Sequence, residues 1–468
     1  MIRPFTLKEI AECLNGQVAG ESQSVAIDRV SIDTRSLTGG ELFVAIKGPH
    51  FDGHDFLPQA EQAGAAAVVV EVLAENCRLP QIRVADTFKT LGQLGKLNRD
   101  QFQGLVTAIT GSCGKTSVKE MLAAVLAEQS EVWSTRGNLN NGYGVPLTLL
   151  EISEKHHKAV IELGTSSPGE IEYIAQLAKP DISVITNAAE AHLEELGSVA
   201  GVAHEKGYIL DSLDSGGIAV LNRDDAFYQE WYDRVLKVQG RSVMSFSVES
   251  TEADVFASEI ETTEQGMRFK LNAQGQVVPV TLAFWGRHQV LNACCAAAAA
   301  LAGGTMLDIV VRGLENARPY QRRGLRYQVS RGGRKLMIFD ETYNANPKAT
   351  LAAIEHLSGY NGLKIMAFGD MLELGSVAEA RHRDMGLYAK EVGIDYFAGF
   401  GTLANLACQA FGKGGCHFED KTALTEWIGD LINKGSDEVV SVLVKGSRGM
   451  GMLDVVRSLV GPEYKGER

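Results

Sequence analysis

The chain has 468 residues, and its 45 Lys and Arg against 58 Asp and Glu give a formal net charge of −13 at pH 7. This length is too great for one hydrophobic core and predicts several domains. The negative charge argues against nucleic acid and membranes as partners, so an anionic ligand would need local cations and backbone donors.

The cysteine pattern and the N-terminus indicate a cytoplasmic protein. The seven cysteines form no C-x-x-C pair, which is typical of reduced thiols. Residues 1–9 lack the basic and then apolar pattern of a signal peptide. No uninterrupted apolar stretch approaches the roughly 20 residues of a spanning helix, so we expect no membrane insertion.

Residues 1–85 are expected to form a first domain of short strands and helices. Apolar runs at 42–46 and 66–70 predict two buried strands. Ahead of them lies a cluster of hydroxyl groups and one guanidinium, contributed by Ser31, Thr34, Arg35 and Ser36. Such a cluster can hold a pyrophosphate, but it can equally be a solvated turn, and composition alone favours neither.

The central feature of the chain is a glycine-rich stretch between an expected strand at 105–109 and an expected helix. It reads Thr110-Gly111-Ser112-Cys113-Gly114-Lys115-Thr116-Ser117. Strand, glycine turn and helix form a phosphate-binding arrangement, in which backbone N–H groups hold phosphate oxygens and the lysine adds a charge. The Thr116 hydroxyl is then placed to reach Mg²⁺.

The match is to a shorter form of the general phosphate-loop motif, because Ile109 stands where that motif has glycine. The alternative is an ordinary glycine-rich turn with a stray lysine, and the flanking strand and helix argue against it. Cys113 is interpreted as a small filler, since no base for a catalytic thiol lies nearby in the sequence.

Two further strands are expected to end beside this loop. The strand within residues 159–164 ends with the carboxylate of Glu162, and the strand within residues 181–187 ends shortly before His192. Since the carboxyl ends of parallel strands face the ligand crevice, Glu162 and His192 are candidates for a metal site with Thr116. Singly, a strand-end glutamate is usually solvated and a lone histidine is usually structural.

The remaining pattern predicts two α/β domains, at 86–316 and 317–468. Alternating apolar residues around 272–275 predict a β-hairpin inserted in the first of these, before an alanine-rich packed helix at 293–302. Apolar strands at 336–339, 363–368, 396–400 and 439–444, separated by helical segments, predict a second parallel sheet.

Several blocks of residues occur in the order seen in Mur ligases and cover nearly the whole chain. They are 109–117, Glu162-Leu163-Gly164, Ala191-His192-Leu193-Glu194, Ala203-His204-Glu205-Lys206-Gly207, 286–292, Asp340-Glu341-Thr342-Tyr343-Asn344-Ala345-Asn346-Pro347, Gly369-Asp370-Met371-Leu372-Glu373-Leu374-Gly375 and Lys445-Gly446-Ser447-Arg448. The chain resembles that family. Gln289, Glu341, Tyr208 and the pair Gly142-Tyr143 depart from its usual pattern.

The resemblance implies three α/β domains. These are a small mixed N-terminal domain that binds a UDP-sugar, a central ATPase-type parallel sheet with a β insertion, and a C-terminal Rossmann-like domain. It implies an ATP-dependent amide ligase of peptidoglycan precursor synthesis, which activates a UDP-muramoyl-peptide carboxylate as an acyl phosphate. The 340–347 and 369–375 blocks are similar to the branch whose acceptor is D-alanyl-D-alanine. The runner-up is a relative that adds one amino acid, or glutamate to folate. The partners would be small molecules only, and a monomer is expected.

The resemblance also implies roles for particular residues. ATP would contact the 111–117 loop, Asn292 and Asp340, and Mg²⁺ would be held by Thr116, Glu162, His192 and a carbamylated Lys206. Arg323, or in its place Arg322 or Arg326, would reach the phosphates from the C-terminal domain and act with Lys115, His192 and Lys206 in catalysis.

The asparagines after the 336–339 strand are candidates for the acceptor site. Tyr343, Asn344 and Asn346 carry hydroxyl and amide groups suited to a small zwitterionic peptide. They follow a strand end, where an open α/β sheet exposes its ligand edge. The alternative is that these asparagines shape the turn before Pro347 or contact the nucleotide.

Overall fold

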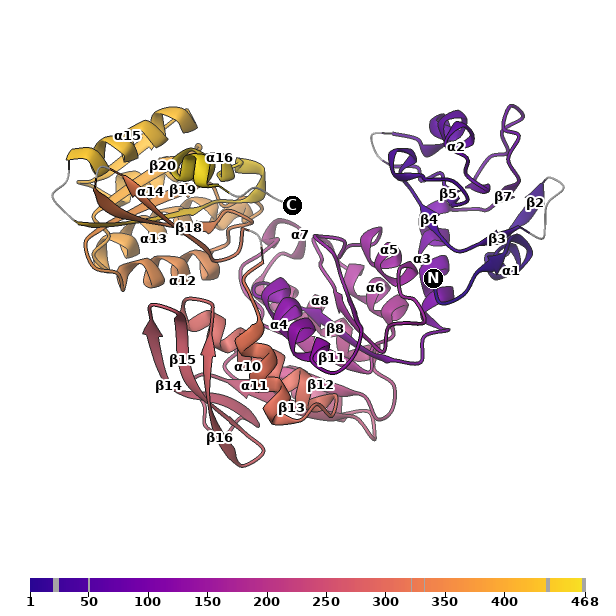
Figure 1. Ribbon diagram of the computed structural model, residues 1–468, viewed down its shortest axis with the longest axis horizontal. Coiled ribbons are helices and arrows are strands. Elements are labelled where there is room, and N and C mark those ends of the chain that lie inside the picture. The colour runs from indigo at the N-terminus through magenta and orange to yellow at the C-terminus, as the bar shows by residue number, and fades with distance from the viewer. Residues whose placement is uncertain (20–24, 49–50, 321, 332, 435–437, 465–468) are drawn as a thin grey trace.

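The computed structural model describes residues 1–19, 25–48, 51–320, 322–331, 333–434 and 438–464. Three sheet-containing parts follow one another along the chain, and the middle part lies between the other two (Figure 1). No helix within these ranges is long and apolar enough to cross a membrane.

The N-terminal part contains a five-stranded sheet in the order β2 (Gln17–Ala19), β7 (Gln81–Arg83), β6 (Ala67–Val70), β5 (Leu42–Val44) and β4 (Val30–Ser31). All neighbours in it are parallel except β2 and β7. The strands expected at 42–46 and 66–70 are confirmed as β5 and β6. A ladder of β1 (Phe5–Thr6) and β3 (Ala26–Ile27), with helices α1 (Leu7–Cys13) and α2 (Leu57–Gln62), completes this part.

The N-terminal core also uses helices from further along the chain. Leu91 and Leu94 of α3 (Thr87–Arg99) and Leu150 of α5 (Gly144–Leu150) are buried in the same cluster as Leu42 and Val69 of the sheet. The apolar face of α3 therefore joins the first two parts of the chain.

The central part is built on a nine-stranded sheet. Its order is β16 (Gln276–Leu282), β15 (Gly266–Ala273), β14 (Val255–Thr263), β13 (Ser242–Ser247), β12 (Ile218–Asn222), β11 (Ile182–Ile185), β8 (Leu105–Thr110), β10 (Lys158–Glu162) and β9 (Val132–Ser134). Strands β8 to β14 pair parallel with one another, β15 pairs antiparallel with β14, and β15 and β16 form the expected antiparallel hairpin. The hairpin extends the edge of the sheet.

Apolar side chains of the central strands point alternately to the two faces of the sheet, and helices cover both faces. On one face lie α4 (Lys115–Ala127), α10 (Arg287–Ala302) and α11 (Leu307–Asn316). On the other lie α5, α6 (Glu170–Ala178), α8 (Val199–Asp211) and α9 (Tyr228–Leu236). The packed helix expected at 293–302 is confirmed, because Ala293 to Ala300 of α10 are at most 1% exposed.

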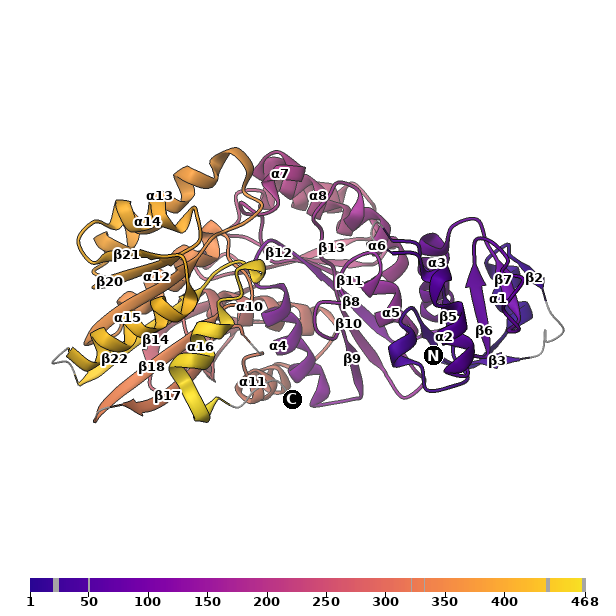
Figure 2. The same cartoon turned by 90° about the horizontal axis from the view of Figure 1, so that it is seen from above.

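The C-terminal part has a six-stranded sheet in the order β17 (Leu325–Arg331), β18 (Arg334–Glu341), β22 (Val439–Lys445), β19 (Leu363–Gly369), β20 (Tyr396–Phe400) and β21 (Gly415–Phe418). The expected strands are confirmed and are parallel, whereas β17 pairs antiparallel with β18. The helices are α12 (Pro347–Ser358), α13 (Ala378–Glu391), α14 (Ala404–Phe411), α15 (Lys421–Lys434) and α16 (Leu453–Val460). Separate apolar clusters fill the two faces of this sheet. The C-terminal domain lies beside the end of the central domain that carries α4 and α7 (Leu193–Leu196) (Figure 2).

Candidate active site

The glycine-rich loop joins the end of β8 to the start of α4. Gly111 has φ 150° and Gly114 has φ 82°, backbone conformations that residues with a side chain rarely adopt. A Cβ at Gly111 would overlap Thr186 Oγ1, and one at Gly114 would overlap Asn292 Oδ1. Both glycines are thus required by conformation and by close approach.

The end of β11 holds the loop in place. The backbone N–H of Cys113 donates to Asn187 Oδ1 at 3.1 Å, and Thr186 Oγ1 donates to the Cys113 carbonyl at 2.6 Å. The Ser112 N–H donates to the Asn187 carbonyl at 3.0 Å. Lys115 Nζ folds back to donate to the Gly111 carbonyl at 2.6 Å, and burial lowers the pKa of Lys115.

Thr116 and Glu162 are in contact, as expected for residues near the carboxyl ends of neighbouring parallel strands. Thr116 Oγ1 donates to Glu162 Oε2 at 2.8 Å, and Asn140 Nδ2 donates to Oε1 at the same distance. Glu162 is buried, with 1% of its surface exposed. A hydroxyl and a carboxylate are oxygen ligands of the kind that Mg²⁺ prefers, so this pair fits a Mg²⁺ site shared with nucleotide phosphates.

His192 and Lys206 lie close enough to Lys115 to affect one another's charge. His192 has φ 53°, immediately before α7, and burial lowers its pKa. Lys206 lies in α8 with 2% of its surface exposed. Burial, and then the charge of Lys115, lower the Lys206 pKa to about 7.

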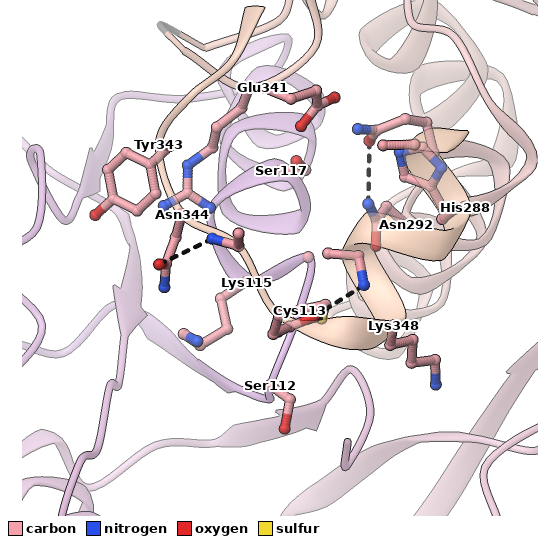
Figure 3. Close-up of a pocket in the computed structure, with 18 of the residues that line it drawn as sticks. Ser112, Cys113, Lys115, Ser117, His288, Asn292, Glu341, Tyr343, Asn344 and Lys348 are labelled. Atoms are coloured by element: carbon pink, nitrogen blue, oxygen red, sulfur yellow. Dashed lines mark hydrogen bonds between the residues drawn. The ribbon is translucent and has the colours of Figure 1, made fainter. Parts of the chain in front are cut away.

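A pocket opens where the central and C-terminal domains meet (Figure 3). The central domain contributes the 112–115 loop residues, Ser117, Asn187, and His288, Gln289, Leu291 and Asn292 of α10. The C-terminal domain contributes Arg322, Arg323, Glu341, 343–346, Lys348, Ala349, Ala352, Ala353 and Lys445. Side chains of both domains therefore face one cavity at the phosphate loop.

At the end of β18, Glu341 lines the pocket in place of Asp340, which the sequence indicates as the nucleotide contact. Asp340 is fully buried, and its Oδ1 accepts hydrogen bonds from the N–H and hydroxyl of Thr342. Glu341, not Asp340, is among the residues that line the pocket, and its Oε2 lies 3.7 Å from Lys445 Nζ. Burial raises the pKa of both carboxyl groups.

Of the three candidate arginines, Arg322 and Arg323 line the pocket, and Arg323 also lies over the ring of Tyr343. Its guanidinium carbon lies 3.6 Å from the ring centre of Tyr343, and its side chain lines the pocket. Arg322 also lines the pocket, but its Nη2 donates to the Thr342 carbonyl. Arg326 lies over Trp285 and is not a lining residue.

Asn346 connects the two domains. Its Oδ1 accepts from the Ala349 N–H at the start of α12, and its Nδ2 lies 3.1 Å from Cys113 Sγ. Asn344 lines the pocket, and its carbonyl accepts from Lys445 Nζ at 3.0 Å. The hydrogen bond from Ala349 makes Asn346 the N-cap of α12, which favours the alternative that Asn346 shapes the turn before Pro347.

The polar cluster of the N-terminal domain is separate from this pocket. Ser31 and Ser36 bring their hydroxyl oxygens to 2.9 Å, and Thr34 lies in the short 3-10 turn between them. The side chain of Arg35 is 88% exposed and pairs with Asp33 at 2.7 Å. This turn belongs to the lobe on the far side of the central domain from the C-terminal one (Figure 1).

Several lining residues were not singled out as site residues in the sequence. Asn187 follows strand β11, and Lys445 is the last residue of strand β22. The reasoning from strand ends that selected Glu162 could therefore have found both. His288 and Lys348 lie near the starts of helices α10 and α12, where the sequence has no comparable signal.

Comparison with known proteins matches family models in all three parts of the chain. The Mur ligase family catalytic domain matches residues 26–99, the Mur ligase middle domain matches residues 109–300, and the Mur ligase glutamate ligase domain matches residues 325–448.

Individual relatives match over nearly the whole length. The UDP-N-acetylmuramoyl-tripeptide–D-alanyl-D-alanine ligase of Escherichia coli (strain K12) is 40% identical, over 97% of this chain and 98% of the relative. A crystal structure of MurF from Acinetobacter baumannii superposes with a TM-score of 0.92 at 34% identity, covering 98% of this chain and 99% of that one. MurF from Thermotoga maritima in complex with ADP gives a TM-score of 0.81 at 27% identity, covering 92% and 97% of the two chains. The chain belongs to the Mur ligase family.

Proposed function

We propose that this protein is the ATP-dependent ligase that joins D-alanyl-D-alanine to a UDP-N-acetylmuramoyl-tripeptide in peptidoglycan synthesis. The observation that carries the proposal is the interdomain pocket. It combines a phosphate loop with the strand ends of the C-terminal domain, in a chain 40% identical over nearly its whole length to a ligase of that name.

ATP is proposed to occupy this pocket. The 111–117 loop would hold its phosphates through backbone N–H groups, and Lys115 would exchange its bond to the Gly111 carbonyl for a phosphate oxygen. Asn292 and Glu341, at the end of β18, would contact the nucleoside. Arg323, held against the Tyr343 ring, would approach the phosphates from the C-terminal domain.

Mg²⁺ is proposed to bind at Thr116, Glu162 and His192. The described residues include no group of three His, Cys, Asp or Glu side chains placed to hold a metal ion, so nucleotide phosphates would complete the ligand set. Mg²⁺ supplies charge neutralisation for phosphoryl transfer. A carbamate on Lys206 would add an anionic oxygen ligand, and a pKa of about 7 leaves enough neutral amine at Lys206 to react with CO₂.

The residues support a two-step reaction. The donor carboxylate attacks the γ-phosphorus of ATP and releases ADP, which leaves an acyl phosphate on the donor. The acceptor amine then attacks the acyl carbon, phosphate leaves, and the amine loses a proton as the amide forms. Both reactants of the first step are anionic, so Lys115 and Arg323 would act mainly by stabilising the transferred charge.

The donor is proposed to extend from the N-terminal domain to the pocket, and the acceptor is proposed to bind within the pocket. Ser31, Thr34, Arg35 and Ser36 would hold the UDP end of the donor in the N-terminal domain. Asn344, which lines the pocket, would contact the acceptor, and Asn346 would keep the adjoining wall in place.

We infer that the protein acts in the cytoplasm as a monomer. All seven cysteines are free, including the adjacent Cys294 and Cys295, as expected where thiols are kept reduced. ATP and UDP-linked precursors belong to the same compartment. Size-exclusion chromatography with light scattering checks the monomer.

Acceptor choice tests the proposed function. The experiment measures phosphate release by purified protein with ATP, Mg²⁺ and a panel of UDP-muramoyl-tripeptides, with and without D-alanyl-D-alanine. Release should require both donor and dipeptide, and glutamate, lysine or diaminopimelate should replace the dipeptide poorly.

Other results would support the alternatives. If a single amino acid outperforms the dipeptide on a matched donor, the protein belongs to an earlier step of the same series. Nucleotide binding with no release under any combination would indicate a switch or binding module.

A further inference from the structure

The segment after β11 connects the phosphate loop to the C-terminal domain. At its start, the Ala189 N–H donates to Ser112 Oγ at 3.0 Å, and Asn187 accepts the Cys113 N–H. The same segment carries His192 and leads into α7. A shift of this segment would therefore move the loop that is proposed to hold the phosphates.

Three residues of this segment, spaced two apart, contact the C-terminal domain. Glu190 accepts hydrogen bonds from Arg381 of α13, where Nη2 and Nε donate to Oε1 and Oε2, both at 2.7 Å. His192 Nδ1 lies 2.5 Å from Glu373 Oε2. Gly375 lies against the backbone of Glu194.

The contact between Arg381 and Glu190 differs from an ordinary surface ion pair, which contributes little. Both carboxylate oxygens are engaged, and Arg381 Nη1 also donates to Asp384 at 2.8 Å, so the guanidinium is held in one orientation. The Glu190 side chain is only 21% exposed. By contrast, Arg383 on the same helix reaches its partner Glu379 only at 3.9 Å.

Neither Arg381 nor Glu190 is among the residues that line the nucleotide pocket, although both line a second cavity beside it. They are thus not placed to touch the phosphates of ATP. Both residues are nevertheless linked to the site. Glu190 directly follows Ala189, whose N–H donates to Ser112 of the loop, and Arg381 belongs to the domain that carries Arg323.

We propose that Arg381 and Glu190 are a positioning pair, which holds the C-terminal domain in register with the phosphate loop so that Lys115 and Arg323 face the same phosphates. The proposal deepens the proposed ligase function and rests on it for the activity measurement. A misplacement of about 1 Å in such a site can reduce turnover by about 100-fold.

A charge exchange tests the pair. The variants are Arg381→Glu, Glu190→Arg and the double variant, and Arg383→Glu is the control on the same helix. In Arg381→Glu and in Glu190→Arg, kcat for phosphate release should fall at least about tenfold with little change in melting temperature. The double variant should recover part of the lost kcat, since the two exchanged charges attract each other again, while the repulsion between Arg381→Glu and Asp384 persists.

A second measurement follows the domains without catalysis. Small-angle scattering with a non-hydrolysable ATP analogue should show the wild-type protein and Arg383→Glu in the compact arrangement in which Arg381 contacts Glu190. Arg381→Glu should be more extended at the same analogue concentration, and the double variant should be compact again.

The proposal is wrong if both single variants keep wild-type kcat and compaction, or if the double variant is no better than the worse single one. Arg381→Gln separates loss of the pair from misfolding, because it removes the charge without introducing repulsion against Asp384. If the wild-type protein releases no phosphate with any substrate, the proposed function fails. The scattering series still tests whether Arg381 and Glu190 hold the C-terminal domain in place.

Discussion

Lys115 is the residue whose position depends most directly on the local sequence. It follows Gly114 at the start of α4, and its Nζ reaches the Gly111 carbonyl across the turn. If it stabilises transferred charge, Lys115→Ala should lower turnover by about two orders of magnitude or more. Phosphate release and a thermal melt measure the two effects, and the melt should change little.

Lys89→Ala is the control for Lys115→Ala. Lys89 has a side chain that is 75% exposed on α3, so loss of this charge should leave phosphate release unchanged. Near-normal turnover of pure Lys115→Ala would remove the loop lysine from the mechanism.

A substitution at Lys206 tests the proposed carbamate on its side chain. Lys206→Ala should lose activity that short carboxylic acids at high concentration partly restore, because they can supply the missing anionic oxygen near the metal. Carbon-13 NMR of protein kept in labelled bicarbonate should show a carbamate carbon that is absent from the variant. An active preparation whose Lys206 carries no carbamate would contradict the proposal.

At the scale of elements, the phosphate-loop turn could be predicted because its determinants lie within a few residues. The same reasoning predicts that Gly114→Ala is harmful for two reasons, a left-handed backbone and overlap with Asn292. The backbone strain alone costs about 1–2 kcal/mol. We expect a larger loss of unfolding free energy, measured by urea titration, and loss of phosphate release.

Gly169→Ala separates the two causes. Gly169 also precedes a helix with φ 82°, but a Cβ there would meet no atom within 4 Å. It should show the strain without the overlap. Equal destabilisation by the two substitutions would mean that the contact with Asn292 contributes nothing.

Strands were predicted well where burial on both faces gives a continuous apolar run, as in β8, β19 and β22. Their direction and neighbours were harder to predict, because these depend on segments distant in sequence. Strand β22 is an example, since it lies between β18 and β19 although it is the last of these strands in the chain. The hairpin of β15 and β16 was predicted because its pairing is local.

At the scale of the whole molecule, the sequence could indicate which strand ends meet within one sheet but not how two sheets face each other. Thr116 lies in the first turn of α4, which follows β8, and Glu162 ends the neighbouring strand β10, so their contact follows from the sheet. The contact of His192 with Glu373 crosses between domains and has no sequence signal. The choice of Glu341 over Asp340 as a pocket residue depends on how the strand end is rotated.

The domain boundaries near residues 85 and 317 remain predictions, and the cores indicate that fragments cut there will behave differently. Both apolar clusters of the C-terminal sheet draw all their residues from 327–464. A 317–468 fragment should therefore unfold cooperatively by itself, as seen by near-ultraviolet circular dichroism and urea titration.

A 1–85 fragment, in contrast, should not fold. It lacks Leu91, Leu94 and Leu150, which are buried in its core by α3 and α5. At about 1.5–3 kcal/mol for each buried side chain, their loss removes roughly 5–9 kcal/mol, which is comparable to the whole stability of a typical domain. The test compares this fragment with a 1–152 fragment, which restores both helices. If 1–85 unfolds cooperatively with a stability equal to that of 1–152, the helices are not part of its core.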